Sequence, residues 1–214
     1  MWDMDGTLID SEPYWIDAEM NLTARFGVRW THEDGLTLVG NPLDVSARVL
    51  MDRGVPLTAA EVIDELVTEV AARAEVSMPW VPDARALLDE VVRAGIPCAL
   101  VTMSIGSLVD RFVEQAGDVF AAVVTGDQVT NGKPDPEAYL LAAKLLGVDP
   151  AQCVAIEDSP VGIRAAHASG AATIAVPRQT ESPRIQGVTV FTTLEGVTLR
   201  DLGRILYEHT TMVS

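Results

Sequence analysis

Cysteine is scarce in this chain, and the hallmarks of membrane-bound and exported proteins are absent. Two cysteines occur among 214 residues, and each lies in an apolar run. We therefore expect Cys98 and Cys153 to be small buried core residues, which argues against a disulfide framework and fits a reducing, cytoplasmic compartment. No apolar stretch reaches the length of a transmembrane helix, and no signal-peptide pattern opens the chain.

Positive charge is also in short supply. The 15 lysines and arginines face 31 acidic residues, which gives a formal net charge of -16 at pH 7. This balance argues against nucleic acid and anionic membranes as partners. A small phosphorylated metabolite stays compatible with it, because a metal ion, a lysine and backbone amides can make one pocket locally positive.

From about residue 83 onward, short apolar runs alternate with longer amphipathic stretches. Strands that alternate with helices predict parallel crossover connections and a doubly wound α/β sheet. Such sheets bind ligands beyond the carboxyl ends of their strands. We predict strands at Ile96–Val101, Phe120–Val124, Val154–Ile156, Thr173–Val176 and Val188–Phe191, with helices at Asp83–Ala94, Ser107–Gln115, Pro136–Leu146 and Val161–Ala168.

Residues 14–78 have helical patterns and no convincing strand. A helical block between the first strand and the rest of the sheet predicts an inserted small α-helical cap domain at 14–78, on a core domain made of 1–13 and 79–214. Thr58 and Glu61 have the spacing of a capping box at the start of a helix. The predicted cap helices are Trp15–Phe26, Pro42–Arg53 and Thr58–Ala74.

The first strand of the sheet is unusually short in this sequence. A central strand should precede Asp3, yet only Met1 and Trp2 stand before it. A strand of two residues spans much less than an ordinary strand and would leave a hole in the sheet. We therefore expect that residues upstream of Met1 complete this strand.

Two carboxylates, Asp3 and Asp5, follow this first strand and precede Gly6. Residues two apart on a strand point the same way, so both carboxylates could face one ligand, and the glycine allows a sharp turn after them. A divalent cation would relieve their repulsion. One carboxylate could attack phosphorus, and the other could protonate the leaving alcohol and later activate water. A turn in which an aspartate merely caps a helix is the structural alternative.

Two further segments support a phosphoryl site when they are considered together with this pair. Thr102 ends a buried apolar run and Ser104 follows it, a pattern that suits either a phosphoryl oxygen or a helix N-cap. Lys133 stands before Pro134 near a predicted helix start, where it could neutralise the attacking carboxylate and a phosphate oxygen. A lone lysine is usually just solvated, so Lys133 counts only together with the other motifs.

A second acidic pair, Glu157 and Asp158, stands at the end of another apolar strand pattern. Two carboxylates at such a position are costly unless a cation or a helix terminus compensates them. Magnesium is the simplest interpretation, because it takes oxygen ligands and keeps several waters.

These four segments, in this order, resemble the haloacid dehalogenase superfamily over essentially the whole chain. The closest resemblance is to the subgroup of beta-phosphoglucomutase and sugar phosphatases such as 2-deoxyglucose-6-phosphate phosphatase. The segments Asp10-Ser11-Glu12-Pro13 and Glu157-Asp158-Ser159-Pro160-Val161-Gly162-Ile163 are typical of that subgroup. The resemblance implies a Rossmann-like core with an inserted helical cap, whose closure excludes water and selects the substrate.

The resemblance also implies catalytic roles. Asp3 would be the nucleophile that forms an aspartyl-phosphate, and Asp5 would be the general acid and base. Thr102 would hold the phosphoryl group, and Lys133 would stabilise the nucleophile and the transferring charge.

Magnesium would be the cofactor, and the resemblance implies its ligands. Asp3 and Asp158 would bind the ion directly, Asp5 through its backbone carbonyl, with Glu157 beside them. The phosphate pocket would be lined by Gly6, Met103 and Ser104, and Trp15 and Asn41 are candidates for contact with the substrate.

Two departures from the mutase pattern favour hydrolysis of a sugar or polyol phosphate. Similar mutases typically carry a histidine where this chain has Trp15, and an arginine shortly after the glycine aligned with Gly40, where this chain has Asn41. Without that arginine the second phosphate of a sugar bisphosphate lacks its partner. Phosphoryl transfer of the beta-phosphoglucomutase type, or a catalytically weak binding protein with this fold, are the alternatives. We expect a monomer or a weak homodimer.

Overall fold

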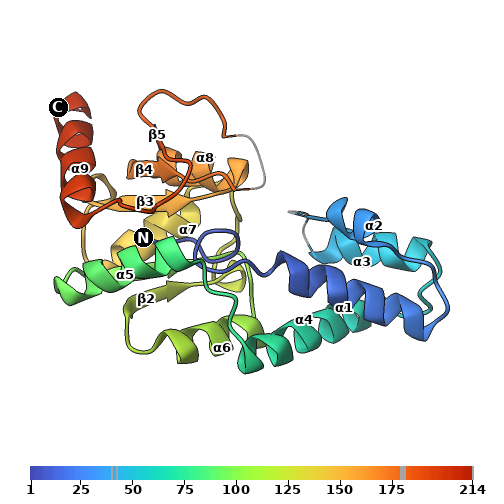
Figure 1. The fold of residues 1–214 in the computed structure, drawn as a ribbon. Helices are drawn as coiled ribbons and strands as arrows, with labels where there is room; N and C mark the ends of the chain where they lie inside the picture. Colours follow the sequence, from blue (N-terminus) through green and yellow to red (C-terminus); the bar gives the residue numbers. More distant parts are fainter. Residues whose placement is uncertain (40, 42, 179–181, 214) are drawn as a thin grey trace. The chain divides into compact units, whose positions relative to one another are not determined.

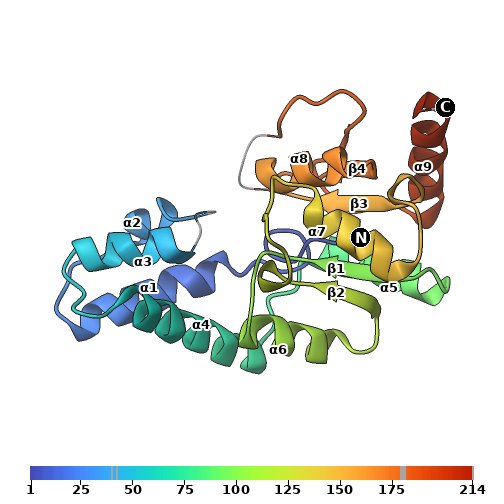
Figure 2. The same ribbon diagram turned by 180° about the vertical axis from the view of Figure 1, so that it is seen from behind.

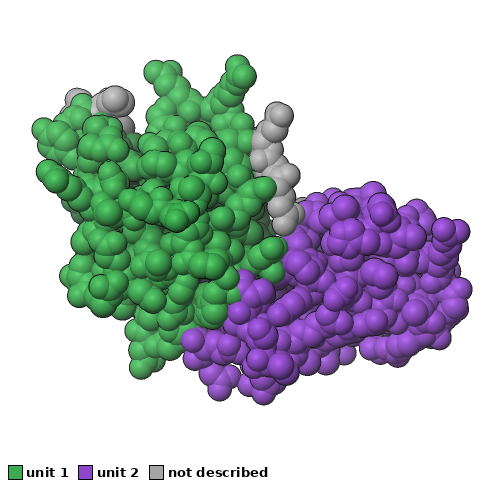
Figure 3. All heavy atoms as spheres, in the orientation of Figure 1, with its two compact units in different colours: residues 1–10, 80–105, 116–214 green, residues 11–79, 106–115 purple. Residues whose placement is uncertain are grey.

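The computed structural model describes residues 1–39, 41, 43–178 and 182–213. The chain divides into two compact units, which Figure 3 distinguishes by colour. The predicted cap, 14–78, falls within unit 2, and so does the segment 106–115, which we predicted in the core. Gln115 connects this segment to the rest of unit 2. Its side-chain amide donates hydrogen bonds to the backbone carbonyls of Ala74 and Glu75, at the end of a unit 2 helix. The predicted domain boundaries themselves stay a prediction. Unit 1 comprises Met1–Asp10, Trp80–Ile105 and Ala116–Ser214, and unit 2 comprises Ser11–Pro79 and Gly106–Gln115.

A parallel sheet forms the centre of unit 1. Trp2 joins its two halves, because it makes parallel bridges to Leu100 on one side and to Ile156 on the other. The order across the sheet is therefore β2, β1, the segment at Trp2, β3, β4 and β5. Every residue of β1 and β4 is buried, as in a parallel sheet that is covered on both faces. The strands are β1 (Cys98–Val101), β2 (Phe120–Val124), β3 (Val154–Glu157), β4 (Ala172–Ala175) and β5 (Thr189–Val190).

Helices of unit 1 cover both faces of this sheet (Figures 1 and 2). α7 and α8 contact each other and lie against β1 to β4 on one face, while α5 and α9 contact each other. α7 ends at Leu146, and the left-handed backbone conformation of Gly147, the next residue, closes the helix. The helices are α5 (Pro82–Arg93), α7 (Glu137–Leu146), α8 (Pro160–Ala168) and α9 (Leu199–Val213), with short 3₁₀ turns at Gly126–Gln128 and Pro150–Gln152.

The predicted fold class is confirmed: a doubly wound parallel sheet with an additional small helical unit. Cys98 and Cys153 are buried and free, as predicted. The helix α9 (Leu199–Val213) is absent from our prediction, although its apolar face packs on the sheet. No helix among the described residues combines the length and the apolar character needed to cross a membrane.

Unit 2 is built from helices. α1 packs on α2 and α4, and α3 packs on α4. The capping box of Thr58 and Glu61 is present at the start of α4, which confirms that prediction. The predicted helix at Pro42–Arg53 corresponds to α3, and both Gly40 and Pro42 lie outside the described residues. The helices are α1 (Glu12–Arg25), α2 (His32–Leu36), α3 (Leu43–Asp52), α4 (Ala59–Val76) and α6 (Ser107–Ala116).

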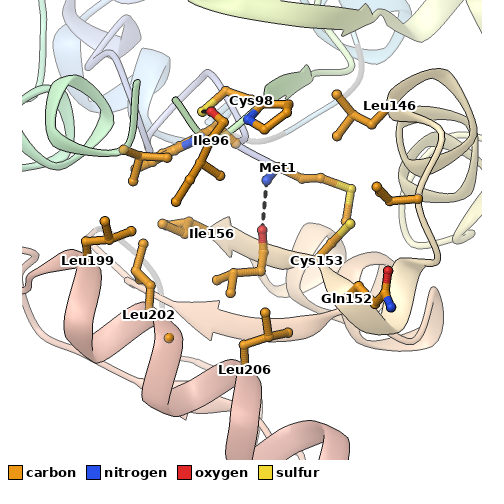
Figure 4. Close-up of a pocket in the computed structure, with 16 residues that line it drawn as sticks. Met1, Ile96, Cys98, Leu146, Gln152, Cys153, Ile156, Leu199, Leu202 and Leu206 are labelled. Atoms are coloured by element: carbon orange, nitrogen blue, oxygen red, sulfur yellow. Dashed lines mark hydrogen bonds between the residues drawn. The ribbon is translucent and has the colours of Figure 1, made fainter. Parts of the chain in front are cut away.

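An apolar cavity of about 390 Å³ lies where the strands of unit 1 begin (Figure 4). Cys98 and Val154 line it at the starts of β1 and β3, and the Met1 amine donates a hydrogen bond of 2.7 Å to the Val154 carbonyl within it. That residues upstream of Met1 complete the first strand stays a prediction.

Candidate active site

Polar side chains gather at the opposite, carboxyl ends of the strands in unit 1. Lys133 lies at their centre, with its side chain 4% exposed. Its ammonium group donates to Asp3 Oδ1 at 2.6 Å, to Glu157 Oε1 at 2.6 Å and to the Val101 carbonyl at 2.9 Å. These three bonds use all three ammonium protons, so the position of the lysine is fully determined. The structure thus brings together four segments that are more than 20 residues apart in the sequence.

The two oxygens of Asp3 have different surroundings. Oδ1 accepts the bond from Lys133, whereas Oδ2 is buried and has no hydrogen-bond partner in the described part of the chain. A buried oxygen of this kind carries an energetic penalty until something binds it. Oxygens of Asp3, Glu157 and Asp158 lie within 4.8 Å of one another. Hard oxygen donors around an unsatisfied carboxylate fit a magnesium ion.

Burial and mutual repulsion dominate the electrostatics of this carboxylate cluster. Burial raises the pKa of the Asp3 carboxyl well above its ordinary value, and the neighbouring Glu157 carboxylate raises it further. Burial, followed by Glu157, also raises the pKa of Asp158, to about 7. Burial alone would lower the pKa of Lys133, but the carboxylates of Asp3 and Glu157 outweigh it and raise that pKa. The cluster therefore favours further positive charge beside the lysine.

Asp5 lies in a second group of contacts, with two hydroxyl side chains that follow β1. Its Oδ2 accepts from Ser104 Oγ at 2.7 Å and from Thr102 Oγ1 at 3.3 Å. Thr102 Oγ1 in turn accepts from the Ser104 amide at 3.0 Å. Three residues predicted to handle the phosphoryl group and its protons are thus in direct contact.

The remaining predicted pocket residues of unit 1 are close to these two groups. Gly6 has φ +84°, a conformation that favours glycine, and a side chain there would overlap the carboxylate of Asp158. Met103 accepts a hydrogen bond through its sulfur from the Lys133 amide at 3.4 Å. Trp15 and Asn41 belong to unit 2, and their part in substrate binding stays a prediction.

Two residues to which the sequence analysis gave no role determine where the Glu157 carboxylate lies. Tyr139, in α7, is fully buried and donates to Glu157 Oε1 at 2.7 Å. Gly162, in the first turn of α8, leaves the space in which the Glu157 carboxylate lies, because a side chain at this position would overlap it. Helical periodicity marks Tyr139 as a core residue, and no local signal in the sequence distinguishes it from the apolar residues around it.

Comparison with known proteins identifies the family. A family model described as haloacid dehalogenase-like hydrolase matches residues 1–176. The chain belongs to this family. Hexitol phosphatase A from Escherichia coli (strain K12) is 35% identical over 211 residues, which cover 93% of this chain and 92% of that protein.

Two other similarities support the assignment to the haloacid dehalogenase-like hydrolases. Validoxylamine A 7'-phosphate phosphatase from Streptomyces hygroscopicus subsp. limoneus is 34% identical over 176 residues, which cover 79% of this chain and 81% of that protein. The crystal structure of CbbY from Rhodobacter sphaeroides in complex with phosphate has a TM-score of 0.81 and 26% identity, and the match covers 94% of this chain and 97% of that one. The predicted enzyme class, a phosphoric monoester hydrolase of this family, is confirmed by the family match and by the phosphatase relatives.

Proposed function

We propose that this chain is a magnesium-dependent phosphatase that hydrolyses a small sugar or polyol phosphate through an aspartyl-phosphate on Asp3. The observation that carries the proposal is the difference between the surroundings of the two Asp3 carboxylate oxygens. One oxygen is fixed by Lys133, and the other is buried without a partner. A carboxylate that is oriented and unsatisfied in this way is suited to bind a cation and to attack phosphorus.

Asp3 and Asp158 would hold magnesium, with Glu157 beside them and the backbone carbonyl of Asp5 as a further ligand. When bound, the ion supplies countercharge to these carboxylates and to the phosphoryl oxygens. Lys133 adds a second positive charge on the side of Asp3 Oδ1. Together they reduce the repulsion between an anionic nucleophile and an anionic phosphate ester.

In the first step, Asp3 forms a bond to phosphorus as the bond from phosphorus to the substrate oxygen breaks. Asp5 gives its proton to the leaving oxygen, so the product leaves as an alcohol. In the second step, Asp5 accepts a proton from water as that water attacks phosphorus. The bond between Asp3 and phosphorus breaks, inorganic phosphate forms, and both carboxyl groups return to their starting states. Ser104 and Thr102 hold Asp5 Oδ2 and thereby orient the group that transfers the proton.

The proposed substrate class rests on the similarity to hexitol phosphatase A and on the two departures from the mutase pattern at Trp15 and Asn41. A polyol or sugar phosphate carries one phosphate and several hydroxyl groups, which suits a single phosphate site. A cytoplasmic location and a monomeric or weakly dimeric state stay predictions.

The test is release of inorganic phosphate from a panel of sugar, polyol and nucleoside phosphates, with and without magnesium. We expect magnesium-dependent release from a few sugar or polyol phosphates. Asp3→Asn should keep the fold and lower kcat by at least 1,000-fold, on the order of the loss of a catalytic nucleophile. Asp118→Asn is the matched control, because Asp118 is exposed in unit 1. Substantial turnover by Asp3→Asn would refute the covalent route, and little net release with a requirement for a bisphosphate activator would indicate a mutase.

A further inference from the structure

Tyr139 is a buried polar residue to which the steps above assign no task. It lies in α7 with an exposure of 0%, and its hydroxyl donates a hydrogen bond of 2.7 Å to Glu157 Oε1. The Lys133 ammonium nitrogen lies 5.3 Å from the centre of its ring. Because the side chain has no exposed surface, it cannot contact a substrate. Any effect on the reaction must pass through the residues that it touches.

Glu157 Oε1 is the atom through which Tyr139 reaches the catalytic lysine. It accepts from the tyrosine hydroxyl and from Lys133, and these two bonds occupy both of its lone pairs. The other oxygen, Oε2, accepts from Ser159 Oγ at 3.2 Å. The carboxylate is fully buried, so water does not compete for these positions.

Lys133 is shared between two carboxylates at equal distance, 2.6 Å to Asp3 and 2.6 Å to Glu157. The strength of the hydrogen bond that each carboxylate forms with Lys133 depends on the negative charge density of that carboxylate. A hydroxyl that donates to Glu157 withdraws charge from that side. The hydrogen bond from Lys133 to Asp3 is therefore stronger than it would be if Glu157 accepted from Lys133 alone.

We propose that Tyr139 is a positioning residue. By donating a hydrogen bond from its hydroxyl to Glu157, it strengthens the bond of the Lys133 ammonium to Asp3. The inference rests on the proposed function, in which Lys133 orients the nucleophile. It adds a residue that acts on the reaction without contact to substrate or metal.

The kinetic test is Tyr139→Phe, which removes the hydroxyl and keeps the ring. We expect kcat to fall about tenfold, the rate equivalent of roughly one hydrogen bond to a charged group, while KM changes less than about twofold. In a Lys133→Met background, Tyr139→Phe should cause no further loss, because its effect passes through the lysine. Thr173→Val, in β4, is the matched control: it removes another buried hydroxyl, which donates to the Ala171 carbonyl just before that strand, and should leave kcat unchanged.

A second measurement reports on the surroundings of Lys133 directly and needs neither turnover nor metal. The sequence contains two lysines, Lys133 and Lys144, and Lys144 is exposed. In protein labelled with ¹³C-lysine, the ¹H–¹³C spectrum therefore has two Cε signals, which Lys133→Met assigns. Tyr139→Phe should shift the Lys133 signal and leave that of Lys144 unchanged. Thr173→Val should shift neither.

The outcomes separate this inference from the proposed function. An active wild-type enzyme with an unchanged kcat and Lys133 signal in Tyr139→Phe would overturn the role of Tyr139 alone. Equal losses from Tyr139→Phe with and without Lys133 would also overturn it, since the hydroxyl would then act elsewhere. If wild-type protein released no phosphate from any substrate, the proposed function would fail. The Cε shift would still decide whether Tyr139 positions the lysine.

Discussion

Gly162 offers a sharp test of how closely the site is packed. It lies in the first turn of α8, and a side chain there would overlap the carboxyl group of Glu157. Glu157 cannot simply move aside, because Lys133 and Tyr139 hold one of its oxygens and Ser159 the other. We therefore expect Gly162→Ala to displace the carboxylate and to break these bonds.

The magnitude follows from two opposing effects. Alanine in place of glycine within a helix ordinarily stabilises a protein by about 1 kcal/mol. Disruption of a buried ion pair costs about 3–5 kcal/mol, because it leaves a buried charge without its partner. The expected net effect is a decrease in the free energy of unfolding of about 2–4 kcal/mol. Since Glu157 also holds Lys133, kcat should fall at least tenfold, which corresponds to about 1.4 kcal/mol.

The assay is urea unfolding followed by circular dichroism, together with phosphate release under magnesium. Gly203→Ala is the matched control, because Gly203 lies in α9 and an added side chain would meet no atom within 4 Å. This control should be as stable as the wild type or up to about 1 kcal/mol more stable, with unchanged kcat. If Gly162→Ala were as stable and as active as Gly203→Ala, the argument that Glu157 is fixed in place would be wrong.

Two further changes test carboxylates outside the cluster, the buried Glu19 and the partly buried Asp83. Burial raises the pKa of Glu19 from 4.5 to about 7. Between these pH values the unfolded chain loses a proton that the folded chain keeps, so the free energy of unfolding falls as pH rises. Glu19→Gln should therefore have the same free energy of unfolding as the wild type near pH 4.5 and one that is about 1–3 kcal/mol higher at pH 8. If urea unfolding gave both proteins the same pH profile, this prediction would be wrong. Asp83 accepts hydrogen bonds from Arg178, Thr193 and the Leu194 amide. Asp83→Ala should lower the free energy of unfolding by about 2–3 kcal/mol, and a loss below 0.5 kcal/mol would show that these bonds contribute little.

The strands and helices of unit 1 were largely predictable, because each follows from a local pattern. The predicted strand at Phe120–Val124 has the same bounds as β2, and the apolar run at Ile96–Val101 contains β1. α8 begins where Ser159 caps the helix and Pro160 opens it. The helix α9 was missed, although its apolar residues recur at helical spacing. Those residues find their partners only in the tertiary structure, against α5 and the sheet.

The sequence by itself determined which residue types stand at the ends of the strands. Asp3 and Asp158 each directly follow a residue of the sheet, and Lys133 precedes a helix, so their arrival at one edge follows from parallel strand order. Spacing along the chain could not show how the charges are shared. Only the tertiary structure decided that Lys133 bonds to both Asp3 and Glu157, that Tyr139 holds Glu157, and that one oxygen of Asp3 has no hydrogen-bond partner among the described residues. The reason is physical: hydrogen bonds and burial depend on distances between atoms, and the fold sets these between segments that are far apart in the sequence.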